Sequence, residues 1–255
     1  MAEVDMDELL EQLKSEFSDY ISDRLSSIYG TLDQVKSGVA KGSDALRELR
    51  REIHSLKGAG STFGYPIVSL IAQRLETYCS DLKDLDEKQV AEIQIFADRI
   101  AEMAELEEQP DIAATNQIIR RLPTRFEFDI TDVEVRDIEI MLVTPNKLVA
   151  RKAAGELAAC GFRVNIVSDP IEAISIAVRM PPDMLIASAV MDGLGGIDLI
   201  RGLRAMSVTS HVPAALMTSM GADQLKGVPA DAGIIRLGAT FGDDIAATIT
   251  RFNLG

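Results

Sequence analysis

The sequence predicts two domains of different fold class, an N-terminal all-α four-helix bundle and a C-terminal α/β doubly wound, five-stranded parallel sheet. The 255 residues exceed one small domain and suit two of ordinary size. Up to about residue 107, apolar residues recur at the spacing of amphipathic helices, whereas from residue 138 short apolar strands alternate with helices. With 47% hydrophobic residues, the chain has enough apolar material for two cores.

The first half is expected to form long helices joined by short polar turns. The apolar stripe of the first helix comprises Leu9, Leu10, Leu13, Phe17, Ile21, Leu25, Ile28, Leu32 and Val35. Ser43 with Asp44 is expected to cap the second helix. Pro66 suits the first turn of the third helix, and Asp86 opens the fourth. A short further helix is expected over residues 112–121.

From residue 138 the pattern changes to alternating strands and helices, five times over. Strands are expected at IEIMLV, FRVNIV, DMLIAS, AALMTS and GIIRL, and helices over 148–160, after Asp169-Pro170, over 197–206 and over 243–252. This alternation predicts a parallel sheet with helices on both faces. The expected domains are therefore residues 1–122 and 138–255, with residues 123–137 as the linker.

The composition excludes several classes of function. A formal net charge of −14 disfavours nucleic-acid binding, which needs a surplus of Lys and Arg. The acidic residues are concentrated in residues 1–128. They are expected to form either a solvated surface or a surface that is complementary to a basic partner. Cys79 and Cys160 are too few for a disulfide framework or a zinc site, and each is expected to be buried. Without a signal peptide or an apolar run of about 18–20 residues, we expect a cytoplasmic protein with no membrane partner.

Several reactive groups fall on one side of the predicted second helix, in the stretch HSLKGAGSTFG. His54 is followed by Lys57 and Gly58 at i+3 and i+4 and by Ser61 at i+7. An exposed imidazole can attack an acyl phosphate, a lysine one turn away can offset phosphoryl charge, and a glycine lets a partner approach closely. On spacing alone, an ordinary surface histidine is an equally good interpretation.

The longer stretch REIHSLKGAGSTFGYPIVSLIAQRLE resembles a histidine phosphotransfer (HPt) domain, the four-helix module of multistep phosphorelays, over about residues 5–107. The resemblance implies that His54 is the phosphorylation site and that Lys57 assists it. The partner docking surface that it implies comprises Gly58, Ser61, Gly64 and Gln73. A dimeric histidine kinase core would instead have an acidic residue directly after its histidine, where this chain has Ser55, and no glycine-rich ATP-binding box is found. The expected protein is therefore a phosphocarrier rather than an ATP-dependent kinase, and it needs no cofactor.

The second half resembles a response-regulator receiver over about residues 138–253, through its strand–helix order and the stretches PPDMLIASAVMDGLGGIDLI and VPAALMTS. A receiver uses two acids after its first strand and an aspartate after its third to hold Mg²⁺ and accept the phosphoryl group. The matching acid, acceptor, switch and lysine positions hold Thr144, Pro145, Ser188, Thr218 and Arg236. The resemblance therefore implies a degenerate receiver, or pseudoreceiver, without a metal. Asp192, four residues after Ser188, is not expected to replace the missing acceptor.

Two classes of function remain at this stage. In the first, His54 carries a phosphoryl group between receiver domains, the partners being response-regulator receivers or a hybrid histidine kinase. In the second, the chain is a non-catalytic adaptor that docks a kinase or response regulator. The Lys57-Gly58 pair beside His54 favours the first, since an adaptor would not need it. A phosphate sink that drains a relay in reverse is a third alternative, which the sequence does not distinguish from forward transfer.

Overall fold

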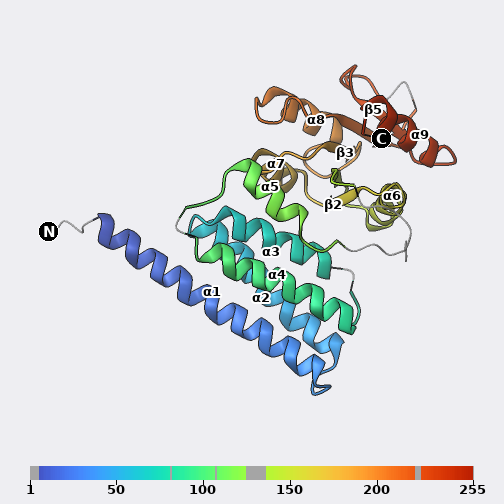
Figure 1. The fold of residues 1–255 in the computed structure, drawn as a ribbon. Coiled ribbons are helices and arrows are strands. Elements are labelled where there is room, and N and C mark those ends of the chain that lie inside the picture. The colour runs from blue at the N-terminus through green and yellow to red at the C-terminus, as the bar shows by residue number, and fades with distance from the viewer. Residues whose placement is uncertain (1–5, 81, 107, 125–135, 222–224, 255) are drawn as a thin grey trace. The chain divides into compact units, whose positions relative to one another are not determined.

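Four long helices form the first half of the chain. They are α1 (Met6–Lys36), α2 (Gly42–Thr62), α3 (Pro66–Cys79) and α4 (Glu87–Ala104). In this computed structural model α1 packs on α2, α2 on α3, α3 on α4 and α4 on α1, which closes a four-helix bundle (Figure 1). A short helix, α5 (Ile112–Arg120), contacts α3. The predicted all-α fold and the predicted short helix are both confirmed.

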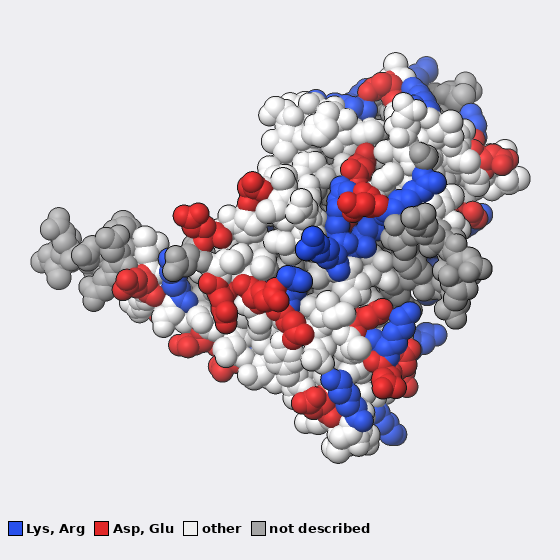
Figure 2. Space-filling view, viewed as in Figure 1, with Lys and Arg blue, Asp and Glu red and all other residues white. Residues whose placement is uncertain are grey.

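The structure describes residues 6–80, 82–106, 108–124, 136–221 and 225–254. The chain divides into two compact units, residues 1–125 and 126–255. Most of the predicted linker, residues 125–135, lies outside the described residues. Figure 2 shows acidic side chains spread over the visible face of the helical bundle, as the net charge of −14 leads one to expect.

The core of the bundle is aliphatic, but the predicted stripe on α1 is buried only in part. Phe17 and the following apolar residues of the stripe, as far as Leu32, pack inside the bundle. Leu9, Leu10 and Leu13 are exposed. The reason is length: α1 has 31 residues against 21 in α2, and its N-terminal turns extend past the other helices (Figure 1).

The helix ends agree with the sequence at two of three places. Pro66 is in the first turn of α3, and the Asp86 side chain caps α4 by accepting a hydrogen bond from the backbone of Gln89. The predicted cap at Ser43 and Asp44 is wrong, because α2 already begins at Gly42. Gly42 passes so close to the α3–α4 connection that a Cβ would lie 2.6 Å from the amide nitrogen of Leu85. Packing against that connection therefore starts the helix early.

The second unit is a five-stranded parallel sheet. Its strands are β1 (Glu139–Val143), β2 (Arg163–Val167), β3 (Met184–Ser188), β4 (Ala214–Thr218) and β5 (Gly233–Arg236). They are arranged in the order β2-β1-β3-β4-β5, which is the order of flavodoxin-like doubly wound folds. Every strand lies within two residues of a predicted one, so the predicted α/β class is confirmed.

Helices cover both faces of this sheet. They are α6 (Lys147–Ala159), α7 (Pro170–Arg179), α8 (Gly196–Ala205) and α9 (Phe241–Arg251). Side chains of α6 and α9 share one buried cluster with alternate residues of β1, β3, β4 and β5. The α7 and α8 helices contact each other and pack on the other face, as right-handed connections require when the chain reverses direction across the sheet.

The connection from β4 to β5 is a stretch for which the sequence pattern predicts no helix. In its described parts, residues 219–221 and 225–232, the chain forms turns and no helix. Gly227 there has a φ of +93°, which interrupts a helix, and Pro229 follows it. An ion pair of 2.7 Å between Arg204 Nη2 and Asp231 Oδ2 ties this connection to the end of α8.

The two cysteines lie in different environments. Cys79 is buried at the end of α3, as predicted. The prediction that Cys160 is buried is wrong: it follows the last residue of α6 and is exposed, because the apolar stripe of the helix has already ended. In the described parts of the chain, no helix combines the length and the apolar character that crossing a membrane requires.

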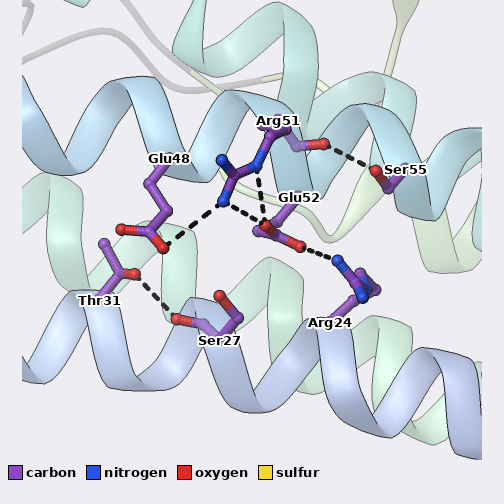
Figure 3. Close-up of polar contacts among 7 residues, drawn as sticks. All are labelled: Arg24, Ser27, Thr31, Glu48, Arg51, Glu52 and Ser55. Carbon is purple, nitrogen blue, oxygen red and sulfur yellow. Dashed lines mark hydrogen bonds and ion pairs between the residues drawn. The ribbon is translucent and has the colours of Figure 1, made fainter.

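A buried carboxylate joins α1 to α2 (Figure 3). Glu52 lies on the inner side of α2 and is only 2% exposed. Its Oε2 accepts a hydrogen bond from Arg24 Nη1 of α1 at 2.9 Å, and its Oε1 accepts one from Arg51 Nη2 at 3.1 Å. A buried carboxylate without a cation is strongly unfavourable, so Arg24, which reaches Glu52 from α1, stabilises the packing of the two helices here.

Removing Arg24 should therefore destabilise the bundle. In Arg24→Met, the Glu52 carboxylate keeps only the largely solvated Arg51, and we expect the free energy of unfolding to fall by about 1–3 kcal/mol. Chemical denaturation followed by tyrosine fluorescence measures this, because all four tyrosines lie within residues 1–125. Arg47→Met is the matched control: Arg47 pairs with Asp44 on the surface, and its loss should cost less than about 0.5 kcal/mol. Equal losses in the two variants would contradict this account.

Candidate functional site

His54 lies on the solvent side of α2. Its neighbours Ile53 and Leu56 are fully buried in the bundle, so the imidazole points outward, and its side chain is 74% exposed. A reactant in solution can therefore reach the ring directly. The only other histidine of the chain, His211, is exposed shortly before β4 and lies in the other unit.

One carboxylate from the neighbouring helix touches both reactive residues of α2. Glu76, on α3, has its Oε1 3.0 Å from His54 Nδ1, and its Oε2 accepts a hydrogen bond from Lys57 Nζ at 2.6 Å. Partial burial alone would raise the Glu76 pKa, but the hydrogen bonds from Lys57 and His54, together with their positive charges, outweigh it. The pKa of Glu76 is thus held below its usual value, and the carboxylate is ionised at neutral pH.

This contact decides which nitrogen of the imidazole is nucleophilic. An ionised carboxylate only accepts hydrogen bonds, so the hydrogen of a neutral His54 ring must be on Nδ1, the nitrogen that faces Glu76. The lone pair is then on Nε2. In its neutral form the imidazole is therefore oriented by Glu76, and its reactive nitrogen is the one that the protein does not use.

A close crossing of α2 and α3 brings these side chains together. A Cβ on Gly60 would lie 2.6 Å from the backbone nitrogen of Ser69, so only glycine lets the helices approach this closely. The Ser69 hydroxyl donates to the carbonyl of Lys57 at 3.0 Å and lies 2.9 Å from the hydroxyl of Ser61. The predicted docking residue Ser61 is therefore also part of the contact between the helices.

Gly58 is placed quite differently from Gly60. Apart from its chain neighbours and the backbone of its own helix, no atom of the described chain lies within 4 Å of the position that its Cβ would take, and the residue is exposed. Folding therefore does not require glycine here, although glycine inside a helix costs about 1 kcal/mol relative to alanine. The packing of the bundle therefore does not explain why glycine, with its cost in helix stability, stands at this position.

Gly64 has a structural role at the end of α2. Its φ of +81° is in the left-handed region, and the amide of Tyr65 donates to the carbonyl of Gly60 at 2.8 Å. This is the geometry of a glycine that ends a helix. The Tyr65 ring then stacks on Phe17 of α1, with 3.8 Å between the ring centroids.

Of the predicted residues, the structure brings His54 and Lys57 together through Glu76. Gln73 lies on α3, about one turn before Glu76, so it is on the helix that faces His54. Glu76 is the residue that reasoning from the sequence missed. Its signal is its spacing: three residues after Gln73, it lies on the same side of α3 and ends the stretch that resembles an HPt domain.

In the second unit, the predicted degenerate positions lie at the carboxyl ends of neighbouring strands. Thr144 follows β1 and Ser188 ends β3; both are buried, and the Ser188 hydroxyl donates to Thr144 Oγ1 at 2.8 Å. Thr218, at the end of β4, accepts a hydrogen bond from the amide of Met220 at 2.9 Å. Pro145 is exposed. The hydroxyls at this edge are thus occupied with one another or with the backbone.

Arg236 does not turn toward these hydroxyls. It ends β5, is exposed, and its Nη1 lies 3.5 Å from Asp244 Oδ1 of α9. Its backbone amide donates to the other oxygen of the same carboxylate at 2.8 Å. The guanidinium is therefore engaged with α9.

The residues at this edge do not fit the Mg²⁺ that receivers hold. Mg²⁺ in proteins is bound mainly through carboxylates, and the acid-pair and acceptor positions offer hydroxyls and a proline. Asp169, after β2, uses its carboxylate to accept hydrogen bonds from the backbone amides of Ile171 and Glu172 and so caps α7. Within the described ranges, no three His, Cys, Asp or Glu side chains gather closely enough to hold a metal ion.

Comparison with known proteins gives a family match for the first half of the chain. Residues 2–109 match the family model of the Hpt domain. None of the curated proteins is a significant match to this chain.

Solved structures of receivers are similar to part of the chain. The receiver domain of a sensor histidine kinase from Pseudomonas aeruginosa PAO1 is 23% identical, with a TM-score of 0.40 over 46% of this chain and 98% of that one. A chemotaxis response regulator of Vibrio cholerae is 19% identical, with a TM-score of 0.40 over 45% and 98%. A response regulator from Desulfuromonas acetoxidans is 23% identical, with a TM-score of 0.40 over 46% and 97%. The assignment of the second unit to a doubly wound fold rests on the strand order of its own sheet and not on these similarities. Residues 2–109 are an Hpt domain, and the chain that contains it is a phosphorelay signalling protein.

Proposed function

We propose that the protein carries a phosphoryl group on His54 Nε2, taking it from an aspartyl phosphate on one receiver domain and passing it to another. The observation that supports this best is the Glu76 carboxylate at 3.0 Å from His54 Nδ1. It leaves the lone pair on the opposite nitrogen of an exposed ring, which is what an in-line attack on phosphorus needs.

The proposed transfer balances without a cofactor. The Nε2 lone pair attacks phosphorus, the bond from phosphorus to the acyl oxygen breaks, and the leaving carboxylate takes the electron pair. The ring then has hydrogen on Nδ1 and phosphoryl on Nε2, and it is a cation. Glu76, already in contact with Nδ1, stabilises that cation, and this contact strengthens as the charge develops.

Lys57 supplies a positive charge beside His54. Its Nζ is held 2.6 Å from Glu76 Oε2, one helical turn from His54. We propose that it offsets the charge of the incoming phosphoryl group as a point charge, while Glu76 retains its contact with the ring. Ion pairing keeps the lysine beside the imidazole before any partner arrives.

Gly58 is proposed as the point of closest approach of the partner, with Ser61, Gly64 and Gln73 around it. The support for Gly58 is that its missing side chain leaves open space beside His54 and serves no packing within the bundle. For the second unit we propose a pseudoreceiver that accepts no phosphoryl group and selects partners. A pure adaptor or a phosphate sink is the alternative, and the contact of Glu76 with both His54 and Lys57 favours chemistry over docking alone.

Replacing His54 tests the phosphorylation site. We expect a His54→Gln chain to take no phosphoryl group from a phosphorylated receiver, because the amide has no nucleophilic lone pair to offer. His211→Gln, which removes the other histidine, should be phosphorylated at the wild-type rate. Transfer is measured with labelled phosphodonor receivers, and the product should be acid-labile and base-stable. Wild-type labelling of the His54→Gln chain would show that another residue is the acceptor.

Enlarging Gly58 tests the docking surface. Gly58→Gln should raise the free energy of unfolding by roughly 0.5–1 kcal/mol through helix propensity and yet slow transfer at least tenfold through its bulk. Gly30→Gln is the matched control, since Gly30 is an exposed glycine inside α1 with equally open space around its Cβ position. The control should gain similar stability and transfer normally. Normal transfer by the Gly58 variant would exclude a docking role.

The pseudoreceiver proposal makes a chemical prediction for the second unit. With His54 replaced by Gln, the chain incubated with acetyl phosphate should form no base-labile acyl phosphate, because the acceptor position holds Ser188. Calorimetric titration of the same chain with Mg²⁺ should show no saturable site in the millimolar range or tighter. A receiver that retains its three acids serves as the positive control. Appearance of an acyl phosphate would mean that another acid, such as Asp192, accepts the group.

A further inference from the structure

Arg50 connects α2 to the C-terminal end of α3. Its Nε and Nη2 donate to the carbonyl oxygen of Cys79 at 3.2 and 2.8 Å. Its Nη2 also donates to the carbonyls of Ser80 at 3.2 Å and Leu82 at 2.7 Å. Cys79 is the last residue of α3, so Arg50 donates to carbonyls at the end of the helix and directly after it, where the regular hydrogen bonds of the helix stop. The Cys79 carbonyl also accepts a hydrogen bond from the amide of Leu82 at 3.3 Å. A cation at this end also opposes the partial negative charge of the helix terminus.

This contact lies directly beside the proposed site on both helices. On α2, Arg50 is one turn before His54. On α3, Cys79 is three residues after Glu76, so the turn that Arg50 holds is the turn that carries the carboxylate. A second close link between the two helices, at Gly60 and Ser69, is about two turns from Glu76. Arg50 is thus the nearer of these two links to Glu76.

The last turn of a helix is the part that frays most readily, because its carbonyls lack intrahelical partners. If the last turn of α3 loosened, the Glu76 carboxylate would leave Nδ1 of His54 and Nζ of Lys57. The same negative helix end would also disfavour a carboxylate at that place. The guanidinium of Arg50 opposes both effects through one set of hydrogen bonds.

We propose that Arg50 is a positioning residue of the phosphotransfer site: by holding the last turn of α3 it keeps Glu76 on His54, and it thereby keeps the imidazole hydrogen on Nδ1 and the lone pair on Nε2. Its effect on transfer rests on the proposed function, whereas its effect on the imidazole does not. Arg50 itself touches neither the ring nor the phosphoryl group.

The test uses the full-length chain and reads the imidazole directly. Nitrogen-15 NMR of the His54 ring distinguishes the Nδ1–H form from the Nε2–H form. In the wild-type protein the Nδ1–H form should predominate among neutral rings. In Arg50→Met it should lose that dominance, as it should in Glu76→Gln, while Arg50→Lys, which retains a cation and donors, should restore most of it.

Arg24→Met serves as the structural control. It is expected to destabilise the bundle through the α1–α2 contact, but it leaves the contact between α2 and α3 intact, so it should not change the proportion of the two ring forms. Measurements are made well below the unfolding transition of each variant, and Arg50→Lys gives a reading even where Arg50→Met does not fold. A ring unchanged in Arg50→Met, or a Lys variant as disturbed as the Met variant, would overturn the proposal.

Transfer kinetics provide a second, separable reading. Arg50→Met should slow phosphorylation of His54 at least threefold and no more than Glu76→Gln does. The double variant should be no slower than Glu76→Gln alone, because Arg50 acts through Glu76. Multiplied losses in the double variant would refute that route. A wild-type chain that is never phosphorylated would overturn the proposed function and leave the NMR result on Arg50 standing.

Discussion

The close crossing of α2 and α3 at Gly60 is the constraint on which the candidate site depends. Glu76 and His54 are 22 positions apart in the chain and belong to different helices. They meet because a glycine at the crossing removes the Cβ that would strike the backbone of Ser69. From that point one polar seam runs along both helices, through Ser61 with Ser69, His54 and Lys57 with Glu76, and Arg50 with the end of α3.

Two glycines in one turn of α2 thus have opposite physical roles. Gly60 is buried and is required by the neighbouring helix, whereas Gly58 is exposed and faces open space. The sequence alone makes both look like departures from helix propensity with one common cause. Only the rotation of α2 about its axis assigns one glycine to the interior and the other to the surface beside the imidazole. A phosphocarrier needs both, since its histidine must be supported from within and accessible from outside.

Local periodicity explains what could be predicted from the sequence. The strands, most helix bounds, the outward direction of His54 and the cap at Asp86 all follow from the spacing of residues within one element. What was missed depends on contacts between elements. The contact of Glu76 with His54 depends on the crossing of two helices. The early start of α2 depends on its packing against the α3–α4 connection at Leu85. The exposure of Leu9 depends on how far α1 extends beyond the other helices. Cys160 lies one residue past the end of α6, and this small shift leaves it exposed rather than buried.

The carboxyl edge of the second sheet has a different electrostatic balance from that of a phosphorylatable receiver. Three carboxylates at this edge would repel one another, and a divalent cation would be needed to hold them together. Here the Ser188 hydroxyl donates to the Thr144 hydroxyl, and both are buried without charge. Such a pair is satisfied by its own hydrogen bond and gains nothing from an ion. Under the proposed function, neither a metal ion nor a phosphoryl group would change the conformation of this unit. A partner would then recognise one state of its surface, and the proposed chemistry of the chain would belong to the helical bundle.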